Sequence, residues 1–378
     1  MTALHDLQTP ALVLDCDKMD ANVARLRGRL TPLGAGLRVH LKTVKSAEVA
    51  RRILGPGDTA CVSTLREAEE FAAAGIRDMI YAVGIAPDKL PRVVALLRRG
   101  VDLAVLLDSP AQARAVAQAS RAAGIAIPAY IELDCDGHRA GLQPGDTDSL
   151  SEIAAILAGD GATLRGVLVH AGESYYAADT AGIAAFAETE RKVAVDAALA
   201  LRARGHACPS VSVGSTPTAH FASDLSGVTE VRAGVFVFFD LVMAGIGVCG
   251  TDDIALSVLT SVIGHQKARG WMLCDAGWMA LSRDRGTQRQ PVDQGYGLVC
   301  DIDGRPYPDL IVESANQEHG VIKLRPGSGA SLPDLPIGTR LRILPNHACA
   351  TAAQHDSYHV VHTGSPKVAA VWPRFGGW

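Results

Sequence analysis

The sequence predicts an α/β fold, with a (β/α)8 TIM-like barrel over residues 16–245 and a β domain over residues 246–378 that also takes the N-terminal strand within 1–15. Two observations lead to this prediction. Up to about residue 240, eight short apolar runs alternate with Ala- and Arg-rich amphipathic stretches, as in a barrel of parallel strands. After about residue 250, closely spaced Val-rich runs, Gly turns and Pro replace the helical pattern.

The eight barrel strands follow from these apolar runs. They are expected at "LRVHL", "TACVS", "MIYAV", "DLAVLL", "PAYIELD", "LRGVLVH", "SVSVG" and "TEVRAG". A doubly wound open sheet is the alternative fold. The number of strands favours the barrel, and no GxGxxG motif opens a helix after the first strand.

Helix signals lie between these runs. In "TLREAEEFAAAG", Thr64 and Glu67 have the spacing of a capping box. The long stretch "GIAAFAETERKVAVDAALALRARG" ends at Gly205, a residue typical of helix ends. The segment "KMDANVARLRGRL" is expected to form the helix that leads into the barrel.

The β domain is predicted from a different set of runs. They are "LSVLTSVIGHQ", "GWMLCDAG", "GYGLVCDIDG", "LIVESANQEHGVIKL", "TRLRILPNHACATAA" and "SYHVVH". The early run "PALVLDC" is expected to form a further strand of this domain, ahead of the barrel.

Composition excludes several classes of protein. Of 378 residues, 48% are hydrophobic and 20% charged, with a net charge of −4 and no basic run, so we expect neither nucleic acid nor a membrane as a partner. No stretch of 18 apolar residues is present, and the start "MTALHDLQTP" does not resemble a signal peptide. The eight Cys form no CxxC pair, which indicates reduced thiols and a cytoplasmic protein.

The candidate chemistry lies where the barrel strands end, because barrel active sites form at the carboxyl ends of the strands. After the first strand, His40 and Lys42 share one face by the period of two. A desolvated Lys in this position can form a Schiff base, whereas an ordinary Lys would only face solvent. Lys45 fits the start of a helix instead.

Other strand ends supply polar groups on the same rim. The fifth strand leads to His138 and Arg139, and the sixth to His170, Ser174 and Tyr175. The last two strands end in "VGSTPT", with Ser215 and Thr216, and in "VRAG", with Gly234.

Loops after the last two strands of such barrels often bind phosphate, and barrel closure brings them next to Lys42. A reactive Lys beside a phosphate site indicates pyridoxal phosphate (PLP), and a sugar-phosphate aldolase would use the same groups.

The tripeptide His-Ala-Cys occurs twice, at His206–Cys208 and at His347–Cys349. The first copy precedes the seventh strand, on the amino-terminal face of the barrel, where we expect stability and no chemistry. The second copy is expected in an extended run of the β domain, so that both side chains share a face. Imidazole and thiolate favour Zn²⁺, with Mn²⁺, Co²⁺ or Mg²⁺ as alternatives. Two protein ligands would leave positions open for substrate.

Seven stretches together resemble the D-serine dehydratase and D-threonine aldolase family. They are "HLKTVKS", "HAGESY", "SVGSTPT", "GVTEVRAGVFVFFD", "DAGWMALSRDRG", "ANQEHG" and "RILPNHACAT". The resemblance covers nearly the whole chain. It implies an alanine-racemase-like fold, a PLP-binding barrel and a head-to-tail homodimer.

The resemblance also implies roles for individual residues. Lys42 would be the Schiff-base lysine, and His347 and Cys349 the metal ligands. The cofactor contacts would be Tyr175, Thr216, Gly234 and Val235, with Arg139 beside them; we place His40, His170 and Ser215 in the same group. Two departures from the family pattern, at Val39 and Phe236, leave the substrate preference open.

The expected activity is a lyase reaction, the PLP- and metal-dependent dehydration of D-3-hydroxy amino acids, with hydroxyaspartate converted to oxaloacetate and ammonia. The alternatives are D-serine dehydration and D-threonine aldol cleavage. A non-enzymatic PLP-binding protein is a further alternative, but the residues after the barrel argue against it. Arg283 and Arg285 in "SRDRG" could bind a second substrate carboxylate or could be solvated loop charges.

Overall fold

The computed structural model describes residues 2–55, 57–137, 139–159 and 161–378. The chain divides into two compact units. We call Arg25–Gly234 with Gly376–Trp378 the barrel unit, and Met1–Ala24 with Val235–Phe375 the sheet unit.

The sequence placed the boundaries at 16 and 245. The start of the first helix belongs to the sheet unit because Asn22 Nδ2 donates to the carbonyl of Asp253 at 2.9 Å. The segment after Gly234 belongs there because the N–H of Leu241 donates to the carbonyl of Pro345 at 3.0 Å.

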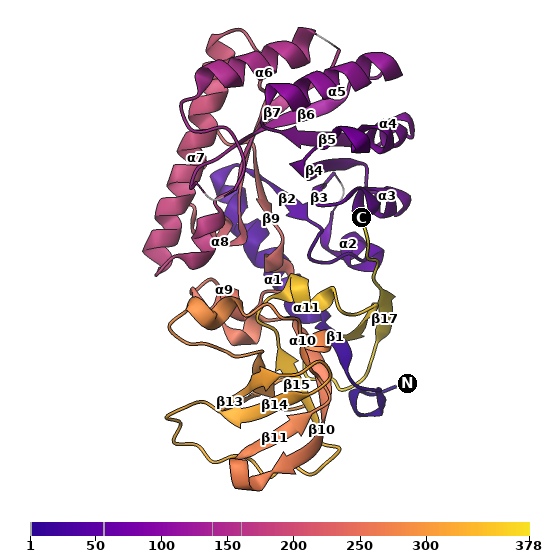
Figure 1. Cartoon of the computed structure of the whole chain (residues 1–378), viewed down its shortest axis with the longest axis vertical. Helices are drawn as coiled ribbons and strands as arrows, with labels where there is room; N and C mark the ends of the chain where they lie inside the picture. Colours follow the sequence, from indigo (N-terminus) through magenta and orange to yellow (C-terminus); the bar gives the residue numbers. More distant parts are fainter. Residues whose placement is uncertain (1, 56, 138, 160) are drawn as a thin grey trace. The chain divides into compact units, whose positions relative to one another are not determined.

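The barrel unit holds a closed barrel of parallel strands in sequence order, which confirms the predicted fold class (Figure 1). The strands are β2 (Gly36–His40), β3 (Thr59–Val62), β4 (Asp78–Gly84), β5 (Asp102–Leu107), β6 (Pro128–Leu133), β7 (Thr163–Val169), β8 (Ser210–Val213) and β9 (Glu230–Ala233). Each lies within one of the eight predicted runs or extends beyond it by one residue at one or both ends. Pairing of Gly36 with Glu230 and of Val39 with Ala233 closes the ring between β2 and β9.

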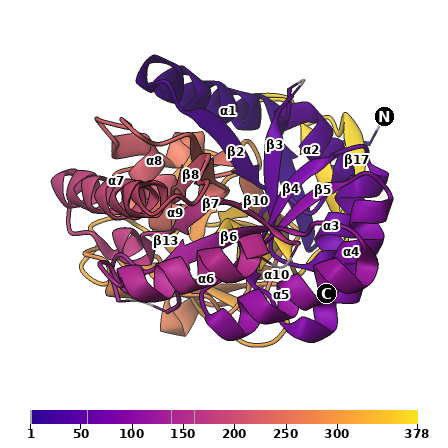
Figure 2. The ribbon, with the colours of Figure 1, turned by 90° about the horizontal axis from the view of Figure 1, so that it is seen from above.

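Helices surround the strands of the barrel unit (Figure 2). They are α1 (Cys16–Leu30, whose first turns belong to the sheet unit), α2 (Ala47–Ile53), α3 (Leu65–Ala73), α4 (Leu90–Arg98), α5 (Pro110–Ala123), α6 (Thr147–Gly159), α7 (Thr180–Ala203) and α8 (Thr216–Phe221). At the start of α3, Thr64 accepts the N–H of Glu67 at 3.0 Å as predicted, but the Glu67 carboxylate binds the N–H of Ser63. No helix in the described ranges is long and apolar enough to cross a membrane.

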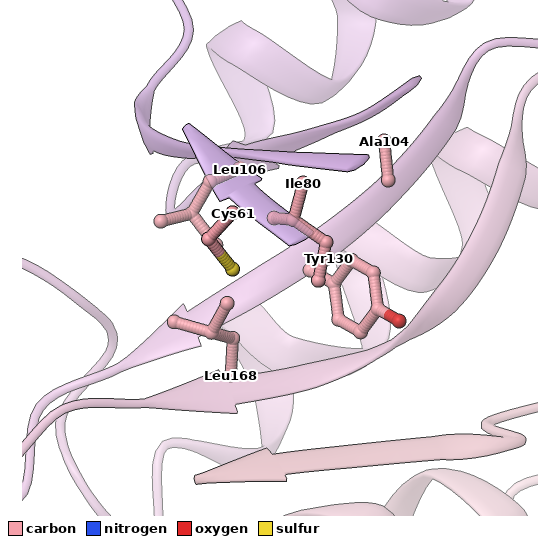
Figure 3. Close-up of a cluster of buried hydrophobic side chains, with 6 residues drawn as sticks. All are labelled: Cys61, Ile80, Ala104, Leu106, Tyr130 and Leu168. Carbon is pink, nitrogen blue, oxygen red and sulfur yellow. The ribbon is translucent and has the colours of Figure 1, made fainter. Parts of the chain in front are cut away.

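Apolar side chains fill part of the barrel interior. Figure 3 shows one cluster of buried side chains, made of Cys61, Ile80, Ala104, Leu106, Tyr130 and Leu168. The cluster joins β3 to β7, which are not neighbours in the barrel, so its side chains meet inside the ring. This interior is a packed core, and the chemistry is left to the strand ends.

The sheet unit is built on a nine-stranded sheet in the order β11-β14-β13-β12-β15-β10-β1-β16-β17. Its strands are β1 (Ala11–Asp15), β10 (Leu256–Gln266), β11 (Trp271–Cys274), β12 (Leu298–Cys300), β13 (Pro306–Ala315), β14 (Gly320–Leu324), β15 (Arg340–Leu344), β16 (Ser357–Val361) and β17 (Ala370–Pro373). The N-terminal strand β1 lies between β10 and β16, which confirms its predicted place in this domain. Strand β17 was not predicted. The described part of the unit also has three short α-helices: α9 (Leu241–Gly245), α10 (Trp278–Leu281) and α11 (Ala348–Ala352).

Candidate active site

Lys42 lies in a turn two residues after the end of β2, with an exposed side chain. Its backbone N–H faces Nδ1 of His40 at 3.4 Å. Lys45 follows in the same turn but is held elsewhere, since its Nζ lies 3.3 Å from a carboxylate oxygen of the buried Glu67. Of these two lysines, Lys42 is therefore the candidate for the reactive amine at this strand end.

Two histidines near Lys42 are neutral at physiological pH. Burial is the main cause, and it lowers the pKa of His40 well below the usual range and that of His170 to about 3. The cations Lys42, Arg139 and Arg232 lower both pKa values further. Nδ1 of His170 lies 2.9 Å from the carbonyl oxygen of Gly214. A carbonyl only accepts, so Nδ1 carries the proton and Nε2 is left as an acceptor.

Arg232 is a buried cation that the sequence reasoning did not single out. It lies on β9, and its guanidinium donates to Ser212 Oγ at 2.8 Å and to the carbonyl of Val169 at 2.6 Å. Arg139 is exposed. With Lys42, these residues bring three cations to this end of the barrel, beside the buried carboxylate of Glu132. Cations of this kind can pair with an anionic cofactor or an amino acid carboxylate. The signal in the sequence was the spacing of Arg232, two residues before Gly234 on the inward face of its strand.

Glu190 is a second residue that sequence reasoning missed. From α7 its buried carboxylate accepts the N–H of Ala171 after β7 and the N–H of Gly214 after β8, both at 2.9 Å. It also accepts the hydroxyl of Thr218 in α8 at 2.9 Å. Burial raises the pKa of Glu190, while these bonds lower it. One carboxylate thus fixes both turns that carry candidate cofactor contacts.

The hydroxyls of these turns form a continuous buried network. Ser215 caps α8, and its Oγ lies 2.9 Å from Ser174 Oγ and 3.0 Å from Thr218 Oγ1. Thr216 follows as the first residue of α8, fully buried, with its carbonyl 2.8 Å from Nδ1 of His220. The network fixes the backbone at the start of α8.

Glycine is required at the end of β9 because the backbones approach closely. A Cβ on Gly234 would lie 2.9 Å from the carbonyl oxygen of His40 and 3.0 Å from Thr43 Oγ1. Val235, the next residue, is buried at the start of a 3-10 turn. Tyr175 is the last of the proposed cofactor contacts. It is half-buried in the turn after β7, and its ring centroid lies 6.3 Å from that of His170.

The structure corrects the predicted backbone of the second His-Ala-Cys. Strand β15 ends at Leu344, so the pair does not lie on one extended face. His347 is instead the N-cap of helix α11, and Cys349 is in its first turn. The helix turns here because the buried carboxylate of Asp240 accepts the N–H of Ala348 at 3.0 Å. The two side chains still meet, since a hydrogen bond joins Cys349 to His347.

Asp284 is a third polar group beside His347. Its Oδ2 lies 2.6 Å from Nδ1 of His347. Burial would lower the pKa of His347, but the negative charges of Cys349, Asp284 and Asp240 raise it well above the usual range. The bond to His347 lowers the pKa of Asp284. A carboxylate that orients an imidazole next to a thiolate is a frequent arrangement around protein-bound zinc.

The two arginines that flank Asp284 differ in their contacts. Arg285 donates to Asp293 at 2.7 Å and lies over the ring of Tyr296. Arg283 lies over the ring of Trp278, with 4.0 Å between its Cζ and the ring centroid, and has no carboxylate partner among the described residues.

The first His-Ala-Cys lies before β8, where no chemistry was expected. Cys208 is buried, its thiol donates to the carbonyl of Ser210 at 3.8 Å, and burial raises its pKa. A thiol of this kind packs as a small apolar group.

Comparisons with known proteins give matches for both parts of the chain. The family model described as alanine racemase, N-terminal domain, matches residues 14–242, and that of a putative serine dehydratase domain matches residues 255–361. The chain is 52% identical over 380 residues to D-threo-3-hydroxyaspartate dehydratase of Delftia sp., covering 99% of each. It is 28% identical over 394 residues to D-serine dehydratase of Dictyostelium discoideum, covering 98% of this chain and 97% of that protein.

Solved structures agree with these matches. The structure of D-threo-3-hydroxyaspartate dehydratase from Delftia sp. has a TM-score of 0.97 at 51% identity, covering 100% of both chains. Two mutant structures of D-threo-3-hydroxyaspartate dehydratase replace a Cys and a His two positions apart with Ala, and the Cys mutant is described as metal-free. Alanine racemase from Bacillus anthracis, at 14% identity and a TM-score of 0.68 over 97% of this chain and 98% of that one, shows the fold alone.

These matches show a PLP-dependent enzyme of alanine-racemase-like fold, with a barrel that carries a lysine at a strand end and a β domain after it. Within that class, the chain belongs to the family of D-serine dehydratase and D-threo-3-hydroxyaspartate dehydratase.

Proposed function

We propose that this protein is a PLP- and divalent-metal-dependent dehydratase of D-3-hydroxy amino acids. Its substrate is D-threo-3-hydroxyaspartate, which it converts to oxaloacetate and ammonia. The observation that carries the proposal is the 52% identity to the relative of that name, covering 99% of both chains. The relatives named D-serine dehydratase and D-threonine aldolase are far less similar, at 26–29% identity.

The barrel unit fits PLP by its charge and by its bare backbone. Lys42 would hold the cofactor covalently, and the cations Arg139 and Arg232 would offset its negative charges. Gly234, where no side chain fits, would let Val235 and its neighbours approach the phosphate through backbone N–H groups. Tyr175, His40, His170, Ser215 and Thr216 complete the proposed contacts. When bound, PLP makes the Cα–H of an amino acid acidic.

Lys42 has a second proposed role. With substrate bound, the Lys42 amine would be the base at this strand end and would take the Cα proton at Nζ.

The sheet unit fits a soft divalent metal by its donor set. His347 and Cys349 would bind the metal, and the pair of mutants known for the relative has the same spacing. Asp284 engages Nδ1 of His347, so Nε2 would face the metal. When bound, the metal supplies a Lewis acid for departure of the 3-hydroxyl.

Dehydration and aldol cleavage are separated by one experiment. D-serine, D-threonine and the isomers of 3-hydroxyaspartate are supplied in turn, and ammonia and glycine are measured. We expect ammonia without glycine, with the highest kcat/KM for D-threo-3-hydroxyaspartate. Glycine as the main product would contradict the proposal in favour of an aldolase. Absence of both products, with PLP bound, would favour a binding protein.

The chain is also proposed to act in the cytoplasm as a head-to-tail homodimer, as its family resemblance implies. All eight Cys are free thiols, as expected in a reducing compartment. Light scattering on the purified protein tests the dimer, and a mass of about 40 kDa, that of a single chain, would contradict it.

A further inference from the structure

A second group of metal-ligating side chains lies at one end of the strand pair β1 and β16. The two strands run parallel, with Asp15 opposite Val361. The residues that follow each strand therefore leave the sheet at the same edge. These are Cys16 and Asp17 at the start of α1, and His362 after β16.

The three ligand atoms face one another closely. Nδ1 of His362 lies 2.9 Å from Asp17 Oδ1 and 3.4 Å from Cys16 Sγ, and Sγ lies 3.7 Å from Asp17 Oδ1. All three atoms fall within 4.8 Å of one another, the only such group among the described residues. Cys16 is 1% exposed, whereas the side chains of Asp17 and His362 are about half exposed. An ion from solvent can thus reach a buried sulfur.

The neighbouring residues hold both segments in place. The Asp15 carboxylate accepts the hydroxyl of Thr363 at 2.8 Å and the N–H of Asp17 at 3.1 Å. Asp17 in turn accepts the N–H of Thr363 through its other oxygen at 3.0 Å. The Asp15 carboxylate is thus used in hydrogen bonds that hold the two segments together. Oδ1 of Asp17 is directed at Cys16 and His362. A site held in this way loses little entropy when it binds an ion.

We propose that Cys16, Asp17 and His362 form a zinc site separate from His347 and Cys349. Zinc bonds of about 2.0–2.3 Å place the ligand atoms of a tetrahedral site about 3.3–3.6 Å apart. The observed separations of 3.4 and 3.7 Å match, and the 2.9 Å pair needs to open by roughly 0.4 Å. A thiolate with an imidazole and a carboxylate selects Zn²⁺ over Mg²⁺ or Ca²⁺.

Binding replaces the thiol proton by the metal. The Cys16 S–H bond breaks, the S–Zn bond forms, and the proton passes to solvent. Water completes the fourth position. The ion joins the start of α1 to the end of β16, so its role is to stabilise this corner of the sheet unit.

Zinc stoichiometry of the full-length holoenzyme tests the site. Wild-type protein and its variants are incubated with Zn²⁺, freed of excess ion and measured by mass spectrometry. We expect Cys349→Ala to retain one equivalent, His362→Ala to lose one equivalent relative to wild type, and the double variant to lose both. Cys208→Ser, which removes a buried thiol elsewhere, should bind as much as wild type.

The outcomes separate this site from the proposed active-site metal. Suppose that Cys349→Ala binds as many equivalents of zinc as wild type, and that His362→Ala binds one fewer. This result would support the site at Cys16, Asp17 and His362 and contradict a metal site at His347 and Cys349. If His362→Ala and the conservative Asp17→Asn both bind as much zinc as wild type, the present site is overturned. Circular dichroism of each variant, compared with wild type, tests whether these exposed substitutions leave the fold intact.

A spectroscopic readout identifies the sulfur ligand. Co²⁺ bound to Cys349→Ala should give thiolate-to-metal absorption that disappears when Cys16→Ser is added. Zinc should raise the melting temperature of Cys349→Ala but not that of Cys349→Ala with His362→Ala. Absorption that persists without Cys16, or equal melting temperatures with and without zinc, would overturn the proposal.

Discussion

The carboxylate of Glu190 accepts the backbone N–H of Gly214 at 2.9 Å, and with the same oxygen it accepts the N–H of Ala171. Two turns that follow different strands of the barrel are therefore fixed by one side chain of α7. Both turns carry proposed cofactor contacts, so Glu190 is a positioning residue. Its removal should lower the affinity of the protein for PLP.

Glu190→Ala should lower PLP affinity by roughly tenfold or more and destabilise the fold by about 2–4 kcal/mol, because two buried N–H groups lose their partner. Glu190→Gln keeps one acceptor oxygen and should cost much less. Fluorescence titration of the apoenzyme with PLP and urea unfolding measure the two effects. Glu188→Ala, on the exposed side of the same helix, is the control and should stay within about 0.5 kcal/mol of wild type. Unchanged PLP affinity in Glu190→Ala would contradict the positioning role.

Lys42→Ala should abolish covalent cofactor binding and turnover. Borohydride reduction of the holoenzyme followed by peptide mapping should find the label on Lys42. Lys45, whose amine pairs with Glu67, should remain unlabelled. A label on Lys45 would refute the assignment.

Cys349→Ala, or chelation, should reduce ammonia release by orders of magnitude while the absorbance of bound PLP is kept. The reason is that departure of the 3-hydroxyl needs the metal, whereas acidification of Cα–H needs only PLP and Lys42. Cys208→Ser should leave turnover unchanged. Full ammonia release from protein shown to be metal-free would rule out this role.

Asp284→Asn should weaken the metal at His347 by about 10–100-fold, since a ligating imidazole depends on its carboxylate partner for orientation. Activity should return at high Zn²⁺, with kcat near that of wild type. Loss of activity that no metal concentration restores would argue that Asp284 does something other than orient His347.

Stability should fall between pH 7 and pH 5, with part of the loss due to His170. Its pKa is lowered to about 3 in the fold, from about 6.5 in the unfolded chain, so below pH 6.5 the unfolded state binds the extra proton. The stability that the neutral ring contributes is full above pH 6.5 and is lost as pH falls toward 3. At pH 5 the loss is about 1–2 kcal/mol. Urea unfolding of apoenzyme at the two pH values should show a smaller difference in His170→Gln; an equal difference would contradict the prediction.

The fold could be predicted because its signals are local. Each barrel strand is a short apolar run between helix-sized segments, and Gly205 and Thr64 mark helix ends by their own chemistry. Once the barrel was predicted, the residues after each strand could be assigned to its carboxyl-terminal face. Lys42 and Gly234 were identified as site candidates for this reason.

The missed residues depend on contacts between distant parts of the chain. Asp284 meets His347 across 63 residues, and Asp240 caps α11 across 108. Nothing in the sequence around His347 reveals that carboxylate, so the segment was predicted as a strand when it turns into a helix. Glu190 had the periodicity of any amphipathic helix residue, and its burial became visible only in the folded barrel.

Closure of the barrel between β2 and β9 has a consequence for synthesis. The edge of β2 that pairs with Glu230 cannot form this pairing until roughly 190 further residues have been synthesised. A ribosome needs about 10–40 s to add them. Strand β1 waits longer still, since its partner β16 lies near the end of the chain. Until then both edges present unpaired backbone groups to other strands in the cell. Yield of soluble protein should therefore depend on how fast the chain is translated and on how well chaperones shield its first half.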